Sequence, residues 1–187
     1  MKNEEQQAHT NRQGPVRSGV MTYQDYDEQY PQVFAEVVKA IETVLPSSHI
    51  EHVGSTSIPG LGGRNVLDIV VVAEPARHAE MESKLVRIGF VKSPFSHFLP
   101  MLTKSIRSHD QDYPILLYLL PEEHEIYQGW IAFRKYMQQH LEEIQRYAEV
   151  KKRAIAEGKT DPASYQQAKT AYLESLVKHI KNQEQGL

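Results

Sequence analysis

Apolar residues recur along the chain with the periods of regular secondary structure. Between residues 30 and 46 they fall three or four positions apart with charged residues between them, which predicts an amphipathic helix stopped by Pro46. Residues 66–72 are apolar except for Asp68, and such a run is typical of a strand covered on both faces. Residues 48–53 form a shorter extended segment before it.

The middle of the chain predicts one more helix and further strands. Residues 76–88 have helical spacing and are followed by a glycine, which suits a helix C-terminus. Residues 90–99 have an extended pattern, and a turn at 110–113 precedes an apolar strand at 115–120. These segments predict two or three strands that pair as antiparallel hairpins.

The last third of the chain is helical in pattern. After Pro121 one broad apolar face continues to Lys151, and we allow for an interruption near His140. Asp161 can cap a final helix that has Pro162 at its first position. The inner face of that helix consists of Tyr165, Ala168, Lys169, Tyr172, Leu176 and Ile180.

This order of elements predicts a small mixed sheet covered by helices, hence an α/β (α+β) domain. The length of 187 residues suits a single domain, which we place at residues 21–187. Residues 1–20 have almost no large apolar side chains, so we expect a disordered polar tail there.

The amino-acid composition argues against several classes of protein. The chain has no cysteine, which excludes disulfides, thiolate metal sites and a cysteine nucleophile. No apolar run approaches the roughly 20 residues that cross a bilayer, and the N-terminus lacks a signal-peptide core, so we expect a cytoplasmic protein without a membrane partner. The net charge of −3 and the lack of a basic stripe argue against a nucleic-acid partner.

The segment from Gly54 to Arg64 is the strongest candidate for chemistry. Its glycines let the backbone approach a ligand, and Ser55 and Thr56 offer hydroxyl and backbone donors to phosphate oxygens. The segment is neither a P-loop nor a dinucleotide-binding motif. It is equally consistent with a glycine-rich connection between strands.

Asp68 is an acid inside an apolar strand, where an isolated carboxylate is costly unless something compensates it. One candidate is Mg²⁺, completed by substrate phosphates. The other is a structural ion pair with Arg64 or another cation. Val66 and Val70 flank Asp68 on its own face of the strand, so they supply no second acid.

Basic and aromatic residues cluster on the two C-terminal helices. If Arg134, Lys151 and Lys169 lie against the glycine loop, they can bind phosphates while a tyrosine such as Tyr165 stacks on a base. If these three residues lie elsewhere, they are amphipathic side chains whose charged groups remain in water. The nine histidines show no helical pair with zinc-ligand spacing, and no G-x-S-x-G motif points to a serine nucleophile.

The chain resembles the GrpB family, which occurs as a stand-alone bacterial protein and as an appended domain on some dephospho-coenzyme A kinases. The resemblance covers about residues 25–180 and is most specific from the Gly-Ser-Thr at Gly54 to the Pro-Gly-Leu that ends at Leu61. The matching residues are Tyr26, Asp27, Tyr30, Pro31, Phe34, His52 to Thr56, Ile58 to Leu61, Leu67 to Ile69, Phe133 to Tyr136, Tyr165 and Lys169.

The resemblance implies a nucleotidyltransferase fold of the DNA polymerase β type. In that fold a Gly-Ser loop holds a nucleoside triphosphate, and a pair of acids on the next strand with a third on a later strand hold metal ions. Asp68 matches one of the pair, its partner falls at Val66 or Val70, and residues 115–120 contain no third acid.

We therefore expect a GrpB-type protein that binds a nucleotide or another phosphorylated small molecule, with a reduced metal site. Asp68 is the expected catalytic and Mg²⁺-binding residue. The expected phosphate and ligand contacts are Gly54, Ser55, Thr56, Arg64, Arg134, Tyr165 and Lys169. The alternative is a non-catalytic accessory domain linked to coenzyme A metabolism.

Overall fold

The computed structural model describes residues 20–94, 96 and 99–185. The polar tail predicted at residues 1–20 therefore lies almost wholly outside it, as do Phe95 and Phe98 of the predicted extended stretch. The helices are α2 (Tyr30–Glu42), α3 (His78–Arg87), α4 (Glu125–Gln139), α5 (Leu141–Ala156) and α6 (Pro162–Gln185), with short 3₁₀ turns η1 (Ser55–Ser57) and η2 (Pro75–Arg77).

Five strands form one mixed sheet in the order β1-β2-β5-β4-β3. They are β1 (Ile50–Val53), β2 (Leu67–Val72), β3 (Val91–Lys92), β4 (Met101–Ser108) and β5 (Gln111–Leu120). The central pair, β2 and β5, is parallel, with Asp68 opposite Leu116, and every other pairing is antiparallel. Both central strands are covered on both faces of the sheet. This confirms the prediction made for residues 66–72 from their apolar run.

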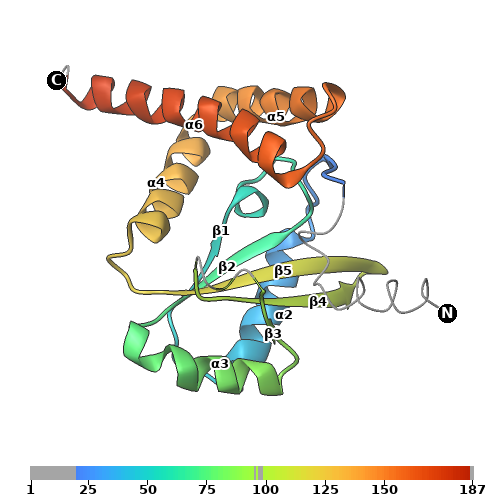
Figure 1. Ribbon diagram of the computed structural model, residues 1–187, viewed down its shortest axis with the longest axis vertical. Helices are drawn as coiled ribbons and strands as arrows, with labels where there is room; N and C mark the ends of the chain where they lie inside the picture. Colours follow the sequence, from blue (N-terminus) through green and yellow to red (C-terminus); the bar gives the residue numbers. More distant parts are fainter. Residues whose placement is uncertain (1–19, 95, 97–98, 186–187) are drawn as a thin grey trace.

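Helices cover the two faces of the sheet unequally (Figure 1). On one face α2 and α3 pack over alternate residues of β2 and β5, including Leu67, Ile69 and Leu117. On the other face the intervening residues, including Val70 and Leu116, meet α4. Helices α5 and α6 cross the end of the sheet at which β2 begins. This arrangement confirms the predicted mixed α/β architecture with a helical C-terminal segment.

The predicted long helix is interrupted at His140, whose backbone has φ −129° and ψ 79° and separates α4 from α5. The imidazole of His140 bonds the carbonyl of Tyr136 and stacks on its ring. Because the break redirects the chain, Leu141 is 69% exposed instead of continuing the apolar face.

The turn predicted at residues 110–113 is shorter than expected. Only His109 and Asp110 turn, both with positive φ, and pairing resumes at once between Gln111 and Ser108. The two-residue connection makes β4 and β5 a tight hairpin.

Among the helices that the structure describes, none is both long and apolar enough to cross a membrane.

Candidate functional site

The glycine loop leaves β1 through a turn that only glycine makes easily. Gly54 has φ +72°, and a Cβ placed there would lie 2.5 Å from Oδ2 of Asp68. The backbone of Gly54 therefore packs directly against the acid of the neighbouring strand. Its carbonyl accepts a hydrogen bond from Oγ of Ser57 at 2.8 Å, which closes the following 3₁₀ turn.

Thr56 and His52 stabilise the loop from its buried side. The Thr56 hydroxyl donates to the carbonyl of Val66 at 3.2 Å and lies 2.9 Å from Nε2 of His52. The His52 ring stacks on Phe34, and burial, with Arg134 nearby, lowers the pKa of His52 to about 4. His52 is therefore neutral at pH 7, and Thr56 acts on the shape of the loop rather than lining the cavity.

Lys151 of α5 reaches beneath the same loop. Its amino group donates to Oγ of Ser55 at 2.9 Å and to the carbonyl of Gly62, and it lies 4.6 Å from the centre of the Tyr147 ring. The side chain is 1% exposed. Burial lowers the pKa of Lys151 well below its ordinary value, and the positive charges of Lys169 and Arg64 lower it further.

A cavity of about 490 Å³ opens between the loop, the sheet and the C-terminal helices. This volume lies in the range usual for small-molecule sites. The sheet side contributes Gly54, Asp68, Leu116 and Tyr118, and the loop exit contributes Arg64 beside Met21. The helical side consists of Gly129, Trp130, Phe133, Tyr147, Pro162, Tyr165, Gln166, Lys169, Leu173 and Val177.

The cavity brings together two basic side chains that the sequence placed in the site. Arg64 has its guanidinium 3.9 Å from the sulfur of Met21. Lys169 lies 5.4 Å from the centre of the Tyr165 ring, and its amino group donates to Gln166 at 3.1 Å. Burial lowers the pKa of Lys169 to about 8, with Arg64 lowering it and Asp68 raising it. Lys169, Arg64 and Asp68 all line the same cavity.

Tyr165 forms part of the wall and is 2% exposed. Its hydroxyl has no hydrogen-bond partner among the described residues. Burial raises the pKa of Tyr165, so the phenol stays protonated at neutral pH. Its ring supports Lys169, while its hydroxyl remains an unused donor.

Asp68 projects from β2 toward the cavity and is half buried. The Tyr118 hydroxyl of β5 donates to its Oδ1 at 3.3 Å. Val66, Val70 and Leu116 belong to the apolar cluster on this face of the sheet, so the cavity side of β2 and β5 carries one acid in the described chain.

This donor set does not fit a two-metal centre, which clamps two ions between several carboxylates. Within the described part of the chain, no three His, Asp or Glu side chains gather where they could hold a metal ion. A single Mg²⁺ would have Asp68 as its protein carboxylate and would depend on ligand phosphates and water for the rest.

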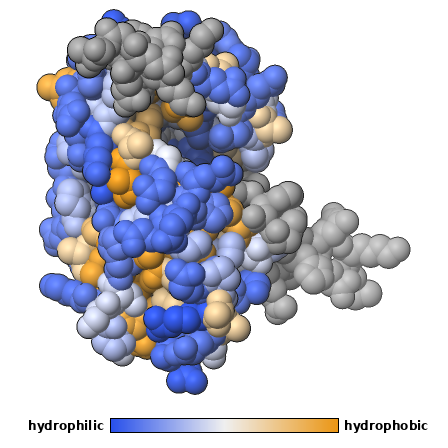
Figure 2. Space-filling view, turned by 90° about the vertical axis from the view of Figure 1, so that its left-hand side faces the viewer, coloured by the Kyte–Doolittle hydropathy of each residue, from blue (hydrophilic) through white to orange (hydrophobic). Residues whose placement is uncertain are grey.

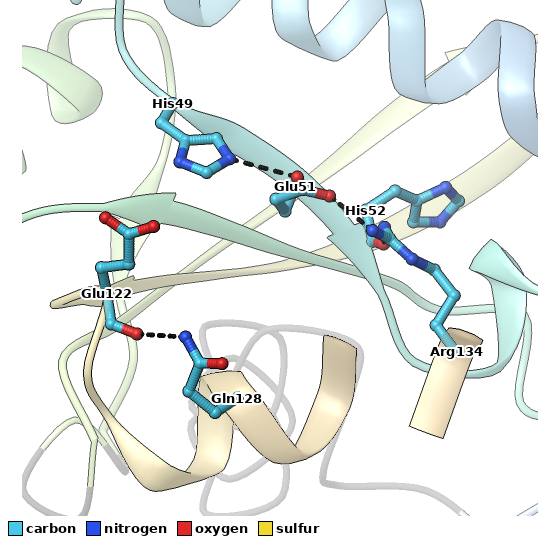
Figure 3. A network of polar contacts seen from close by, with 6 residues as sticks. All are labelled: His49, Glu51, His52, Glu122, Gln128 and Arg134. Carbon is cyan, nitrogen blue, oxygen red and sulfur yellow. Dashed lines mark hydrogen bonds and ion pairs between the residues drawn. The ribbon is translucent and has the colours of Figure 1, made fainter. Parts of the chain in front are cut away.

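Arg134 is absent from the cavity lining and points instead toward Glu51 and His52 (Figure 3). From α4 it donates to Oε2 of Glu51 at 2.8 Å and to the carbonyl of His52, and Glu51 in turn bonds His49 at 3.1 Å. The guanidinium therefore attaches α4 to the edge strand β1. The structure thus brings Gly54, Arg64, Asp68, Tyr165 and Lys169 to one cavity, places Ser55 and Thr56 in the loop beside it, and directs Arg134 elsewhere.

Sequence reasoning missed part of the wall. Tyr118 and Trp130 line the cavity, and nothing in their spacing singles them out as site residues. Their rings lie 5.0 Å apart between β5 and α4. The signal for Lys151 was its place on the apolar face of a helix, where a lysine needs a buried polar partner.

Relatives of the chain come from several bacteria. A UPF0157 protein of Halalkalibacterium halodurans is 26% identical over 166 residues, which cover 84% of this chain and 81% of the relative. A UPF0157 protein of Pseudomonas aeruginosa is 28% identical over 162 residues, covering 76% of this chain and 60% of the relative. A third, from Vibrio cholerae, is 25% identical over 82% of this chain and 78% of the relative.

Solved structures show the same fold. The conserved protein GrpB from Enterococcus faecalis has a TM-score of 0.68 at 22% identity and covers 84% of this chain and 96% of its own. A cytoplasmic RNA terminal U-transferase has a TM-score of 0.53 at 12% identity over 70% of this chain and 42% of its own, so the fold is of the nucleotidyltransferase type. The family described as GrpB protein matches residues 21–179, and the chain belongs to this family.

Proposed function

We propose that the chain binds a phosphorylated small molecule that carries an aromatic ring, such as a nucleotide, in the cavity between the glycine loop and helices α4 and α6. The observation that supports this most is that Arg64 and Lys169 line one cavity, with Lys151 beneath the adjoining loop, and that Asp68 is the one acid among the described residues of the cavity wall. Beyond the effect of burial, Lys169 and Arg64 both lower the pKa of Lys151, and Arg64 lowers the pKa of Lys169, so an anion bound among these positive charges would offset their repulsion.

The two sides of the cavity suit different parts of such a ligand. Arg64 and Lys169 present charged donors, which bind phosphate oxygens about twice as strongly as neutral donors do. Trp130 and Phe133 of α4 present aromatic rings on which a base can stack. A nucleotide with its phosphate at the loop exit and its base against α4 satisfies both sides.

The residues of the cavity support binding of the ligand. Transfer of a nucleotidyl group is a separate step that binding does not imply. The nucleotidyltransferase fold is compatible with transfer of a nucleotidyl group, but fold alone does not establish a reaction. Incubation with labelled triphosphate tests it separately, because release of pyrophosphate would report transfer, whereas binding without release would report a sensor or carrier.

The experiment that tests the proposal is a thermal-shift titration with ATP, GTP, CTP, UTP, AMP and inorganic phosphate. We expect at least one nucleotide to raise the melting temperature, because a ligand that binds only the folded state stabilises it. Arg64→Gln and Lys169→Gln should each weaken binding about tenfold, the loss expected for one charge-assisted hydrogen bond.

Lys39→Gln is the matched control, because Lys39 is exposed in the last turn of α2, on the face of the sheet away from the cavity. It removes the same charge without touching the site. If no compound in the panel shifts the melting temperature, nucleotide binding is refuted and the accessory-domain hypothesis is favoured.

A further inference from the structure

All but one of the acids expected of a metal-dependent phosphate site are missing from the described lining of the cavity, and basic residues are present instead. On the cavity face of β2 and β5 the neighbours of Asp68 are valine, leucine and tyrosine side chains. Tyr118 comes closest, with its hydroxyl 3.3 Å from Oδ1 of Asp68. A phenol held in this way is a hydrogen-bond donor and does not replace an anionic metal ligand.

Positive charge in the same place comes from the protein. Arg64 at the loop exit and Lys169 on α6 line the cavity, and Lys151 lies directly under the loop at Ser55 and Gly62. Arginine stays protonated throughout the accessible pH range. Even with Lys151 neutral, Arg64 and Lys169 together outweigh the single charge of Asp68.

The hydrophobic residues on the described surface do not point to a second binding site. On the face shown in Figure 2 they occur in small separate groups among hydrophilic residues. Exposed apolar side chains such as Val86, Val91 and Leu141 belong to three different elements, α3, β3 and α5. Scattered residues of this kind are normal on a protein surface.

We infer that Arg64 and Lys169 neutralise the ligand phosphate in place of metal ions, so that binding does not require Mg²⁺, and that Asp68 opposes the bound anion. This inference rests on the proposed function. Asp68 lines the same cavity as Arg64 and Lys169, so its negative charge offsets part of theirs. Once a phosphate occupies the site, the carboxylate repels it across a partly buried space.

The inference predicts that Asp68→Asn binds a phosphate ligand more tightly than the wild type does. The amide keeps the shape of the side chain and can still accept the hydrogen bond from Tyr118, while the negative charge is lost. We expect the affinity of the variant to be about three- to tenfold higher at pH 7, because this is the effect of one partly screened charge interaction. A site in which Asp68 holds a required metal would instead lose binding.

The test measures the dissociation constant by calorimetry for AMP and for the tightest-binding nucleotide of the panel, in EDTA and again in Mg²⁺. AMP is included because a single phosphate chelates Mg²⁺ weakly. The variants are Asp68→Asn and, as a matched control, Glu74→Gln, since Glu74 is exposed just beyond the far end of β2. Circular dichroism of each variant confirms folding, and Lys169→Gln should weaken binding in both buffers.

Equal affinity in EDTA and Mg²⁺, with tighter binding by Asp68→Asn alone, supports the inference. Binding that disappears in EDTA, or that Asp68→Asn weakens, overturns it but leaves the proposed function intact. Absence of binding to the wild type in both buffers refutes the proposed function itself, and the inference with it.

Discussion

At the scale of single residues, burial decides what the basic side chains can do. Lys151 of α5 lies beneath the glycine loop, where Ser55 and Gly62 hold it, whereas Lys169 of α6 lines the cavity. The structure therefore separates a lysine that positions the loop from one that can meet a ligand. The sequence shows both only as lysines on apolar helix faces.

Lys169 makes ligand affinity depend on pH. Its pKa is lowered to about 8, so the side chain is charged below pH 8 and neutral above it. Affinity for a nucleotide should therefore fall between pH 7 and pH 9, by up to about tenfold per pH unit above the pKa. Calorimetry at pH 7, 8 and 9 measures the change.

Lys169→Arg is the control for that titration, because a guanidinium keeps its charge over the whole range. We expect it to bind with an affinity that hardly changes with pH. If the affinity of the wild type stays constant to pH 9, Lys169 does not control binding. If the affinity of Lys169→Arg falls as that of the wild type does, the pH dependence belongs to another group.

At the scale of elements, the loop between β1 and β2 is shaped by close packing against its neighbours. Gly54 combines a positive φ with contact to Asp68, and Gly62 lies against Tyr23 and the Gln24 backbone, with no room for a side chain at either position. The glycine pattern predicted close approach of the backbone to a ligand, and in the folded loop these two glycines approach other parts of the protein instead. The reason is that the partners of these glycines come from distant parts of the chain.

Two glycines that line the cavity should respond in opposite directions to alanine. Gly54→Ala forces a Cβ to within 2.5 Å of the Asp68 carboxylate at φ +72°, and should cost about 2–4 kcal/mol of stability. Gly129→Ala lies inside α4, where a Cβ meets nothing within 4 Å, and should add about 0.5–1 kcal/mol. Urea unfolding measures both, and similar effects at the two sites would contradict the close packing at Gly54.

At the scale of the whole molecule, the cavity joins the sheet to helix α6, which begins at Pro162, far along the chain from the last strand, which ends at Leu120. Helix α6 is held on α5 by the stacked rings of Tyr147 and Tyr172, 5.0 Å apart, and by the bond from Tyr172 to Glu143. Figure 1 shows α6 crossing the end of the sheet in front of α5. A ligand in the cavity would therefore contact the loop, the sheet and α6 together.

Ligand binding should slow hydrogen exchange in segments that are distant in sequence. With a saturating nucleotide from the panel, we expect protection of amides in residues 54–64 and 162–170, because both border the cavity. Helix α3, on the other face of the sheet, should exchange at an unchanged rate. Protection of α3 alone, or of the loop without α6, would show that the ligand binds elsewhere.

The sequence alone determined most of the elements and the place of the candidate site. It missed strand β4 at Met101–Ser108, and among the described residues of the extended stretch predicted at 90–99 only Val91–Lys92 is a strand. Periodic apolar residues specify helices and strands because each element buries one face or both, and this local rule located α2, β2, α3 and the glycine loop. Boundaries moved by a few residues, as at the turn of His109 and Asp110, because pairing with β4 extends β5 beyond its apolar run.

Only the tertiary structure decided which polar residues meet. Arg134 and Lys169 look alike in sequence, yet Arg134 pairs with Glu51 on the edge strand while Lys169 lines the cavity with Asp68. Their roles depend on the break at His140 and on the path of α6, which packing across the whole chain determines. A pattern of residues contains no information on distances between segments, and charge interactions depend on those distances.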